Sequence, residues 1–392
     1  MSEDIDVLVG GFGALQGSHS PGIERYILHA GGLAGGLAGG LADGDTDAST
    51  PTVRLERAGL LSDLPSPSWM ERDGGMVYAV LENSDELAAL RLERTADGPR
   101  LDLVSRVPVP SAGPTHVTVA VDDRGAKHAI AACYVGGAIC VFPIGGDGGL
   151  GPAGQVLYGE GHGPLPAQEG PHAHWALALP DGRVLSTDLG ADRIHVHRWR
   201  DGMLVRTGSV ELAPGTGPRD MHPLPSRDGA WRVAVVDEWG DTVTLLGPRE
   251  DDPATAAADG IAVLRTVDLG GDDGDQAASL AFVPDSDDAG GPCAGMAYVG
   301  LRGSERIVAL RWDGARLHRL ADPDAPGWRG RGVSSGGSRP RHLRAIGRFV
   351  VAANEVSDDL TVFHIAPDGE PVPRATLPVG SPTTVLPLPA RS

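Results

Sequence analysis

The sequence is poor in aromatic residues and in cysteine. Phe, Trp and Tyr make up only 4% of the 392 residues, so a buried core has to be built mainly from Val, Leu, Ile and Ala. The three cysteines, Cys133, Cys140 and Cys293, have spacings that match neither a zinc ribbon nor a disulfide framework. We therefore expect buried free thiols, which behave as small apolar side chains.

Positive charge is also scarce. There are 33 basic against 52 acidic residues, a net charge of −19, and a protein of this sign repels phosphate groups. This excludes generic binding to nucleic acid or to anionic membranes. No run of about 18 apolar residues occurs, and the N-terminal MSEDIDVLVGG has neither the basic nor the apolar part of a signal peptide. We expect a cytoplasmic protein, and its oligomeric state stays open.

Glycine and proline are abundant, at 57 and 32 residues, whereas apolar residues almost never recur at helical spacing. One pattern repeats instead: two short apolar strands joined by a turn, a polar or glycine break, and then a third strand rich in Val or Ile. The breaks recur about every 50 residues, a spacing typical of propeller blades. They lie near Asn83, Val135, Leu189, Glu238, Arg302 and Glu355.

Together with VLVGGFG near the start, these make seven copies. We predict an all-β protein, a seven-bladed β-propeller with four-stranded antiparallel blades around a central channel, formed as one domain by residues 1–392. The segment TTVLPLP near the end is predicted to pair near the first blade. Residues 29–52, 249–260 and 270–276 are predicted to be glycine- or acid-rich loop insertions, and the run GGLAGGLAGGLADG is expected to be mobile because it has too little apolar surface to bury.

Several segments also resemble a known family. The similarity covers nearly the whole chain and rests on VGGFG with PGIERY, PSWM, GPTHVTVAVDD with ACYVGGAICVFPI, GPHAHWALALPDGRVLSTDLGADRIHVHRW, GTGPRDMH, VVDEWGDTVTLL, YVGLRGSERIVAL and PRHLRAIGRFVVAANEVSDDLTVF. In order and spacing these resemble the lactonase propeller family, which holds bacterial 6-phosphogluconolactonases and fungal carboxy-cis,cis-muconate lactonising enzymes. The resemblance implies a seven-bladed fold and chemistry on lactones without a metal or other cofactor.

His172 and His174 are the first candidate site residues. They are two positions apart in PHAHW, so on a strand they would project from the same face. Such a pair could hold a metal ion, but the sequence offers no equally clear third ligand. We expect at least one of the two imidazoles to contact the substrate. Related sequences usually carry a proline between the two histidines, where this chain has Ala173.

Arg219, Glu238 and Arg302 are the next candidates, because each interrupts an apolar strand pattern. The resemblance assigns Arg219 to the channel, although the family histidine that follows it is Asp220 here; that aspartate could pair with the arginine. Glu238 matches a family glutamate, and burial among apolar residues could raise its pKa and make it a general acid or base. The alternative is a solvated turn carboxylate. Arg302 has the fork geometry that binds carboxylate or phosphate.

Arg341 repeats the Pro-Arg arrangement of Arg219, and with Arg302 it should make a local excess of positive charge in the channel. Further polar residues are predicted to surround the same channel, and among them we expect substrate contacts from His342, His116, Tyr134 and Asn354. Glu82 and Glu355 belong to the same group. Asp188 and Asp192 are expected to bond turn backbone, and His195 and His197 to be exposed on an outer strand.

The leading functional hypothesis is metal-independent hydrolysis of a sugar-derived, anionic lactone. Arg219, Arg302 and Arg341 would bind the anionic group and stabilise the oxyanion, while Glu238, His172 or His174 would activate water. A cycloisomerase that forms a lactone from a carboxylated diene is the first alternative. A propeller that binds a metabolite or protein without catalysis is the second. No G-x-S-x-G elbow or phosphate-binding loop supports other chemistry.

Overall fold

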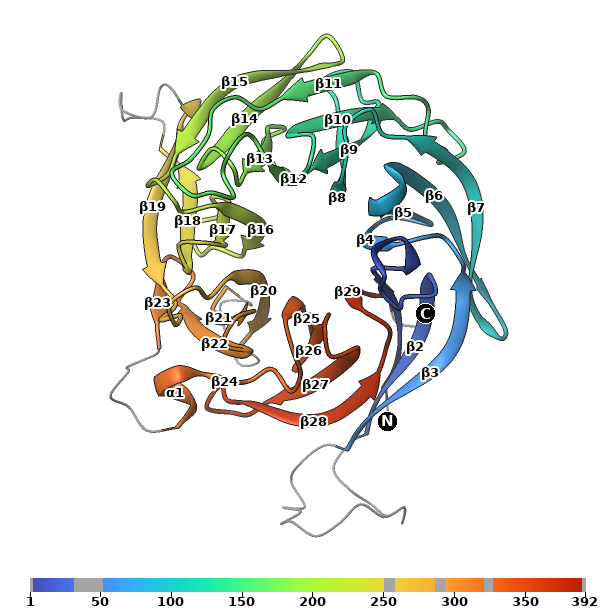
Figure 1. Ribbon diagram of the computed structural model, residues 1–392, viewed down its shortest axis with the longest axis vertical. Helices are drawn as coiled ribbons and strands as arrows, with labels where there is room; N and C mark the ends of the chain where they lie inside the picture. Colours follow the sequence, from blue (N-terminus) through green and yellow to red (C-terminus); the bar gives the residue numbers. More distant parts are fainter. Residues whose placement is uncertain (1–2, 32–51, 250–257, 286–292, 321–326, 390–392) are drawn as a thin grey trace.

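The computed structural model describes residues 3–31, 52–249, 258–285, 293–320 and 327–389. Seven antiparallel sheets stand side by side in a ring around a central channel (Figure 1). Helical structure in the described residues is limited to α1 (Trp328–Arg331) and two single turns, η1 (Ala14–Gln16) and η2 (Glu82–Ser84). The predicted fold class, an all-β seven-bladed propeller, is therefore confirmed.

Each blade has four strands, ordered from the channel outward. The innermost strands are β29 (Pro382–Pro387), β4 (Pro67–Asp73), β8 (Pro114–Val121), β12 (Ala173–Ala178), β16 (Pro218–Leu224), β20 (Ala277–Pro284) and β25 (Pro340–Ile346). The second strands are β1 (Glu3–Gly11), β5 (Met76–Leu81), β9 (Lys127–Cys133), β13 (Val184–Asp188), β17 (Arg232–Asp237), β21 (Gly295–Leu301) and β26 (Phe349–Asn354).

The third strands lie next to these and are covered by the fourth. The third strands are β2 (Ile23–Ala30), β6 (Glu86–Thr95), β10 (Ala138–Pro143), β14 (Arg193–Arg200), β18 (Thr242–Pro248), β22 (Arg306–Trp312) and β27 (Asp359–Ile365). The outermost are β3 (Val53–Ser62), β7 (Gly98–Pro108), β11 (Gln155–Tyr158), β15 (Met203–Glu211), β19 (Ile261–Asp268), β23 (Leu317–Arg319) and β28 (Pro371–Pro378); β24 (Val333–Ser334) adds to β22.

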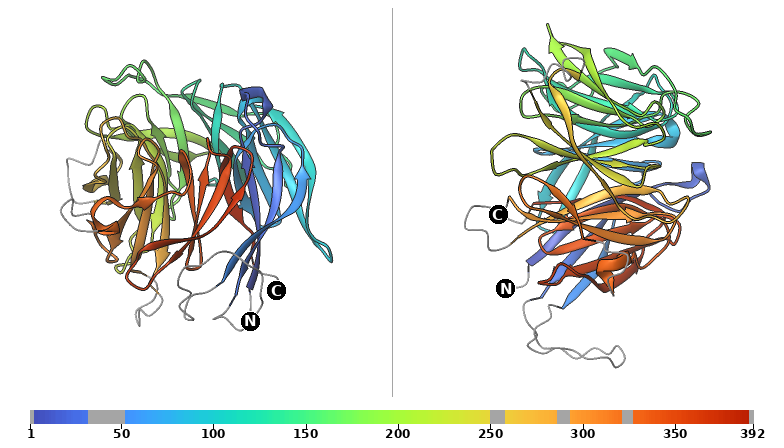
Figure 2. Two further views of the ribbon diagram at one scale, coloured as in Figure 1. Left: turned by 60° about the horizontal axis from the view of Figure 1, so that its bottom comes forward. Right: turned by 90° about the vertical axis from the view of Figure 1, so that its left-hand side faces the viewer.

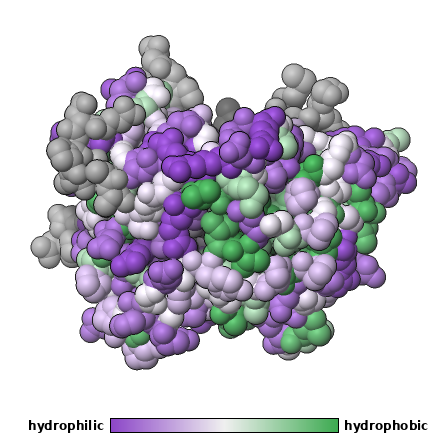
Figure 3. Space-filling view, turned by 90° about the horizontal axis from the view of Figure 1, so that it is seen from above, coloured by the Kyte–Doolittle hydropathy of each residue, from purple (hydrophilic) through white to green (hydrophobic). Residues whose placement is uncertain are grey.

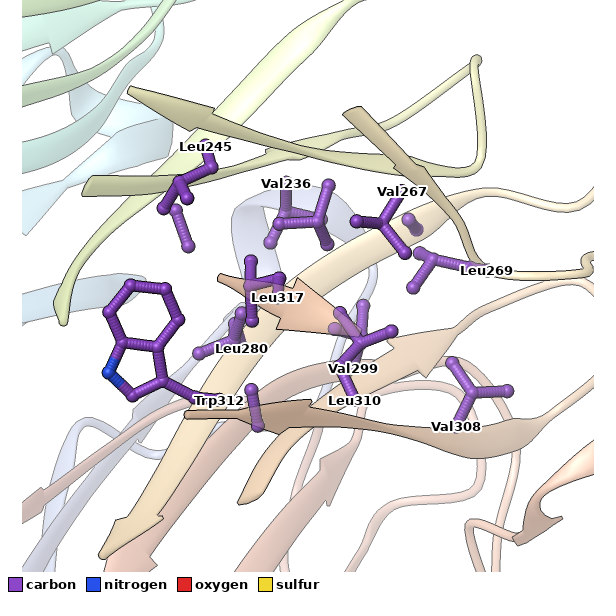
Figure 4. Packing of buried hydrophobic residues seen from close by; sticks show 14 of the residues in the cluster. Val236, Leu245, Val267, Leu269, Leu280, Val299, Val308, Leu310, Trp312 and Leu317 are labelled. Carbon is purple, nitrogen blue, oxygen red and sulfur yellow. The ribbon is translucent and has the colours of Figure 1, made fainter. Parts of the chain in front are cut away.

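The core is divided into layers between adjacent blades. Figure 4 shows one layer, where Val236 and Leu245 of one blade face Val299, Leu310 and Trp312 of the next. Both faces of the middle strands are covered, which explains why they read as continuous apolar runs. Burying a Val or Leu side chain contributes roughly 1.5–3 kcal/mol, so aliphatic residues build this core as the low aromatic content predicted. The outer face seen in Figure 3 is mostly hydrophilic, with apolar residues gathered near its centre.

The ring closes by pairing the two ends of the chain. Strand β29 lies antiparallel to β1, with Val7 opposite Pro387 and Val9 opposite Val385. The start of β1 and the end of β29 lie at the same end of the ring (Figure 2). The prediction that TTVLPLP pairs with the first blade is confirmed. Closure completes the seventh blade, and the ring leaves only short, protected sheet edges along the channel.

A β-bulge recurs where each innermost strand begins. The pairing of the first two strands shifts register there in all seven blades. A bulge adds an unpaired residue and redirects its side chain. The bulge residues are Ser68, Thr115, His174, Arg219, Ala278 with Ser279, Arg341 and Thr383. Three of these side chains also donate a hydrogen bond to a backbone carbonyl in the bulge of the next blade. Thr115 donates to the carbonyl of His174, Arg219 to that of Ala278, and Thr383 to that of Ser68.

The predicted insertions lie between strands where the structure describes them. Residues 29–52 run from the end of β2 to the start of β3, residues 249–260 separate β18 from β19, and residues 270–276 separate β19 from β20. Most of the first segment, including nearly all of the glycine-rich run, and residues 250–257 lie outside the described residues.

The expectation that His195 and His197 are exposed is wrong. The His195 side chain is only 5% exposed, and His197 is completely buried. Neighbouring blades cover both faces of β14, since Ile194 and Val196 pack against the next blade and Trp199 packs against the preceding one. Within the blade, the Nε2 atom of His197 bonds Ser186 Oγ at 3.0 Å and His195 Nδ1 bonds Ser209 Oγ at 2.8 Å. Burial lowers the pKa of His197 to about 3.

The cysteines follow the sequence prediction in part. Cys133 and Cys140 are buried and free, with 3.9 Å between the two Sγ atoms, whereas Cys293 is only half-buried. Across the described ranges no helix is long and apolar enough to cross a membrane.

Candidate active site

One end of the channel, here called the upper mouth, is formed by the first residues of the innermost strands and the residues that follow the second strands. The residue after each second strand donates its backbone N–H to the residue just before the bulge segment, as Glu238 does to Gly217 and Arg302 to Gln276. This bond recurs in every blade and fixes one further side chain at the mouth. These residues are Phe12, Glu82, Tyr134, Leu189, Glu238, Arg302 and Glu355.

The centre of the upper mouth is an ion-paired cluster of Arg219, Glu238 and Arg302. The Oε2 atom of Glu238 lies 3.0 Å from Arg219 Nε, and its Oε1 atom lies 2.7 Å from Arg302 Nη2. The two arginine side chains are each 5% exposed, and that of Glu238 is 12% exposed. Residues from two blades therefore meet in one nearly dry cluster.

The expectation of a raised pKa for Glu238 is wrong. Burial does act to raise it, but the Arg302 and Arg219 charges outweigh burial and hold the pKa of Glu238 below its usual value. A carboxylate held ionised between two guanidinium groups is a weak base. Its two ion pairs hold both arginine side chains in place.

Asp220 pairs with Arg219, the alternative that the sequence left open. Arg219 Nη1 lies 2.7 Å from Asp220 Oδ1, and the same Oδ1 lies 3.5 Å from Nδ1 of His174. Burial raises the pKa of the Asp220 carboxyl to about 6, because it outweighs the opposing Arg219 charge. Burial also holds the pKa of His174 well below its usual value. At neutral pH a neutral imidazole therefore stands beside an ionised carboxylate.

His172 and His174 do not act as a simple same-face pair. The bulge between Ala173 and Trp175 breaks the strand alternation between them. His172 stacks on Tyr134 and its Nδ1 bonds the Tyr134 carbonyl at 2.8 Å, whereas His174 turns toward Asp220. Within the described ranges, no three His, Cys, Asp or Glu side chains are grouped so that they could hold a metal ion.

Arg341 reaches the same mouth from the blade next to that of Arg302. Its Nη1 lies 3.3 Å from Glu355 Oε2, and its guanidinium stacks over Phe12 at 4.8 Å. Burial raises the pKa of nearby Glu82 despite the Arg341 charge. The predicted excess of positive charge is wrong, because Glu238, Asp220 and Glu355 form ion pairs with the three arginines.

One predicted contact, Asn354, lies away from the mouth. Asn354 is completely buried, and its amide donates to Asp359 Oδ1 at 2.7 Å and to the Ser335 carbonyl. It ends strand β26, and the mouth position that follows is occupied by Glu355. Asp188 holds the corresponding place in another blade and accepts the N–H of His172, so its predicted structural role is confirmed.

His116 and His342 lie deeper, in a layer of rings that closes the channel below the mouth. His116 stacks on Trp175 with 3.7 Å between ring centroids, and Trp69 contacts both His342 and Trp175. Sequence reasoning missed the two tryptophans and the bulge threonines. These residues could have been found from their position in the repeat, because each lies one or two residues after the first residue of its innermost strand.

Above this layer is a small cavity of about 20 Å³, roughly the room that one water molecule needs. It is lined by Ser68, Trp69, Glu82, Thr115, His174, Trp175, Arg219, Asp220, Arg341, His342 and Thr383. A sugar-sized ligand is too large for this cavity.

A closed ring of seven blades with buried arginine, glutamate and histidine side chains at one mouth defines the class, a seven-bladed β-propeller with a polar channel site. The family described as Lactonase, 7-bladed beta-propeller matches residues 38–387. The chain belongs to this family.

Individual relatives agree with that assignment. The 6-phosphogluconolactonase of Bacillus subtilis (strain 168) is 28% identical over 295 residues, 74% of this chain and 73% of the relative. The 6-phosphogluconolactonase of Pectobacterium carotovorum is 26% identical over 276 residues, 68% and 72% of the two chains. The periplasmic gluconolactonase of Pseudomonas aeruginosa has a similar fold, with a TM-score of 0.75 at 24% identity over 99% of this chain and 100% of that one.

Proposed function

We propose that this protein hydrolyses a sugar-derived lactone with an anionic substituent, such as 6-phosphogluconolactone, without a metal ion. Family membership supports the lactone class, and the names of two relatives support the phosphorylated sugar. The observation that carries the proposal is the buried Arg219–Glu238–Arg302 cluster beside His174 and Asp220. Ester hydrolysis needs fixed positive groups for an oxyanion and a base for water, and this cluster supplies both.

In the proposed reaction His174 is the general base. Its Nδ1 lies 3.5 Å from Asp220 Oδ1 without a hydrogen bond between them. In the proposed tautomer Nδ1 carries the proton, and the Nε2 lone pair takes a proton from water as the water oxygen attacks the lactone carbonyl carbon. Asp220 stabilises the imidazolium that forms. The imidazolium then returns the proton to the ring oxygen as the carbon–oxygen bond breaks, and the product is the open-chain hydroxy acid.

Arg302 and Arg219 stabilise the negative charge that develops on the carbonyl oxygen. Glu238 holds both guanidinium groups in place before the substrate arrives, so that little reorganisation is needed during the reaction. Arg341 binds the anionic substituent. Its ion pair with Glu355, at 3.3 Å, is longer than the 2.7 Å pair of Arg302 with Glu238, and its side chain is 18% exposed, so its guanidinium is more accessible to a ligand.

The test is a substrate panel with two proteins, the wild type and the Glu238→Gln variant. The substrates are 6-phosphogluconolactone, gluconolactone and 3-carboxy-cis,cis-muconate, each corrected for its rate without protein. The proposal expects hydrolysis with the highest kcat/KM for the phosphorylated lactone, and a loss of about two orders of magnitude or more in Glu238→Gln. Turnover of the muconate alone would identify a lactone-forming enzyme, and no turnover of any substrate would point to a binding protein.

A further inference from the structure

The opposite end of the channel holds a second, larger cavity. Each innermost strand begins at the upper mouth and runs away from it, as the pairing of Pro67 with Leu81 and of Asp73 with Met76 illustrates. The last residues of these strands therefore form the other end, here called the lower mouth. A cavity of about 440 Å³ opens there, and it is lined mainly by Glu71, Thr118, Leu177, His222, Phe282 and Arg344.

The layer of rings separates this cavity from the upper mouth. Trp69, Trp175 and His342 line both cavities, and the ring centroids of Trp69 lie 4.6 Å from Trp175 and 5.1 Å from His342. A ligand in the lower cavity would therefore contact the far side of this layer and not the Arg219–Glu238–Arg302 cluster.

Arg344 gives the lower cavity an unpaired positive charge. Its side chain is exposed to the channel, and in the part of the chain that the structure describes no carboxylate lies within ion-pair distance of it. The nearest carboxyl that influences it is Glu71, whose pKa is raised by burial to about 7 despite the Arg344 charge. A guanidinium stays charged at all physiological pH values, so Glu71 compensates for it only partly. The three arginines of the upper mouth, in contrast, all have carboxylate partners.

Two histidines supply neutral donors to the same cavity. The Nε2 atom of His222 accepts the backbone N–H of Leu280 at 3.3 Å, and Nδ1 of His116 accepts that of Ala176 at 3.4 Å. A backbone N–H can only donate, so these nitrogens carry no proton. Burial lowers the pKa of His222 to about 3, so its ring is neutral and carries its one proton on Nδ1; in His116 the proton is on Nε2.

Most of the other residues that line the cavity are apolar, and they include Trp175, Leu177, Leu280 and Phe282. A volume of several hundred Å³ with apolar residues and a few directed polar groups is the usual form of a small-molecule site. We propose that the lower cavity binds a small carboxylate with an aromatic or other apolar body. The carboxylate lies on Arg344 with the histidine N–H groups nearby, and the body packs on Trp175, Leu177 and Phe282.

The test measures binding of 3-phenylpropionate and of its neutral analogue 3-phenylpropionamide by titration calorimetry at millimolar concentrations. Arg344→Gln is expected to weaken 3-phenylpropionate binding about tenfold or more, because it removes a charge-assisted contact, and to leave the amide unchanged. Arg302→Gln is the matched control at the upper mouth and should bind both compounds as the wild type does. Equal binding by wild type and Arg344→Gln, loss of binding in Arg302→Gln, or no binding to the wild type would overturn the proposal.

A second variant tests the apolar wall. Leu177→Trp places a larger side chain in the cavity and is expected to abolish binding of both the acid and the amide. A thermal unfolding midpoint close to that of the wild type would establish that the variant is folded. Undiminished binding of either compound by this folded variant would place the ligand elsewhere and overturn the proposal.

Discussion

Nδ1 of His342 accepts the backbone N–H of Val385 at 3.1 Å. This bond joins the innermost strand of the last blade to the strand that closes the ring. The same contact recurs between His116 and Ala176 and between His222 and Leu280. An innermost strand has backbone groups on the channel side without a strand partner, and these three imidazoles satisfy some of them. They hold neighbouring blades together, which gives His116 and His342 a structural role.

Replacing His342 should therefore destabilise the ring. His342→Leu leaves the N–H of Val385 buried without an acceptor, which costs about 1–3 kcal/mol, whereas His342→Gln keeps an acceptor and should cost less. Denaturant unfolding of both variants checks the difference. If the leucine variant is as stable as the glutamine variant, the contact does not stabilise the ring.

Arg302 should be essential for turnover. Arg302→Ala removes one of two guanidinium groups from the proposed oxyanion site and is expected to lower kcat/KM for 6-phosphogluconolactone by about two orders of magnitude or more. Arg124→Ala is the control, because Arg124 is 63% exposed and its ion pair is with exposed Asp201. Near-normal kinetics in Arg302→Ala would remove this arginine from the mechanism.

Activity should fall on the acid side of pH 6. The pKa of Asp220 is raised to about 6, and the ionised form is needed to stabilise a protonated His174. As the pH falls through 6, protonation of Asp220 removes that support and kcat/KM should decline. Asp220→Asn should be less active and should lack this acid limb, while His174→Gln should lose turnover at every pH. A pH profile of kcat/KM for the three proteins decides the matter, and an unchanged acid limb in Asp220→Asn would rule out this role.

Asp237 should make stability depend on pH. Its carboxylate is completely buried and accepts hydrogen bonds from Thr242 and Thr244, yet burial raises its pKa to about 7. A folded-state pKa above the unfolded value contributes stability that is present at low pH and is lost as the pH rises toward 7.

The unfolding free energy of the wild type should therefore fall between pH 5 and 8, and this fall should be smaller in Asp237→Asn. The difference is at most roughly 1.4 kcal/mol for each unit by which the pKa of Asp237 is raised. Asn354, which holds the same place in another blade, indicates that an amide fits there. Asp201→Asn, at a side chain that is 94% exposed, is the control. Parallel pH curves for wild type and Asp237→Asn would contradict the prediction.

Local sequence patterns predicted most of the fold. Runs such as Val233–Val236 and the turns around them specify strands and hairpins, and their regular spacing gives the number of blades. The same reasoning was wrong for His195 and His197, because strand alternation alone does not tell whether a second blade covers the polar-looking face.

The candidate site was predicted only in part. Arg219, Glu238 and Arg302 could be identified because each interrupts an apolar pattern, and their meeting follows from the ring. The pKa of Glu238 could not be predicted, since it depends on which guanidinium groups lie within 3 Å of the carboxylate. Asn354 was misplaced by one position, because the register at the end of β26 decides which side chain reaches the mouth.

The sequence by itself thus determined the strands, the turns and the sevenfold repeat, because backbone preference and apolar alternation act between residues close in the chain. Only the tertiary structure decided which charges pair, which histidines are buried and that the channel has two separate cavities. Those properties depend on contacts between blades, where the bulge in each innermost strand and the closure of β29 on β1 bring distant residues together.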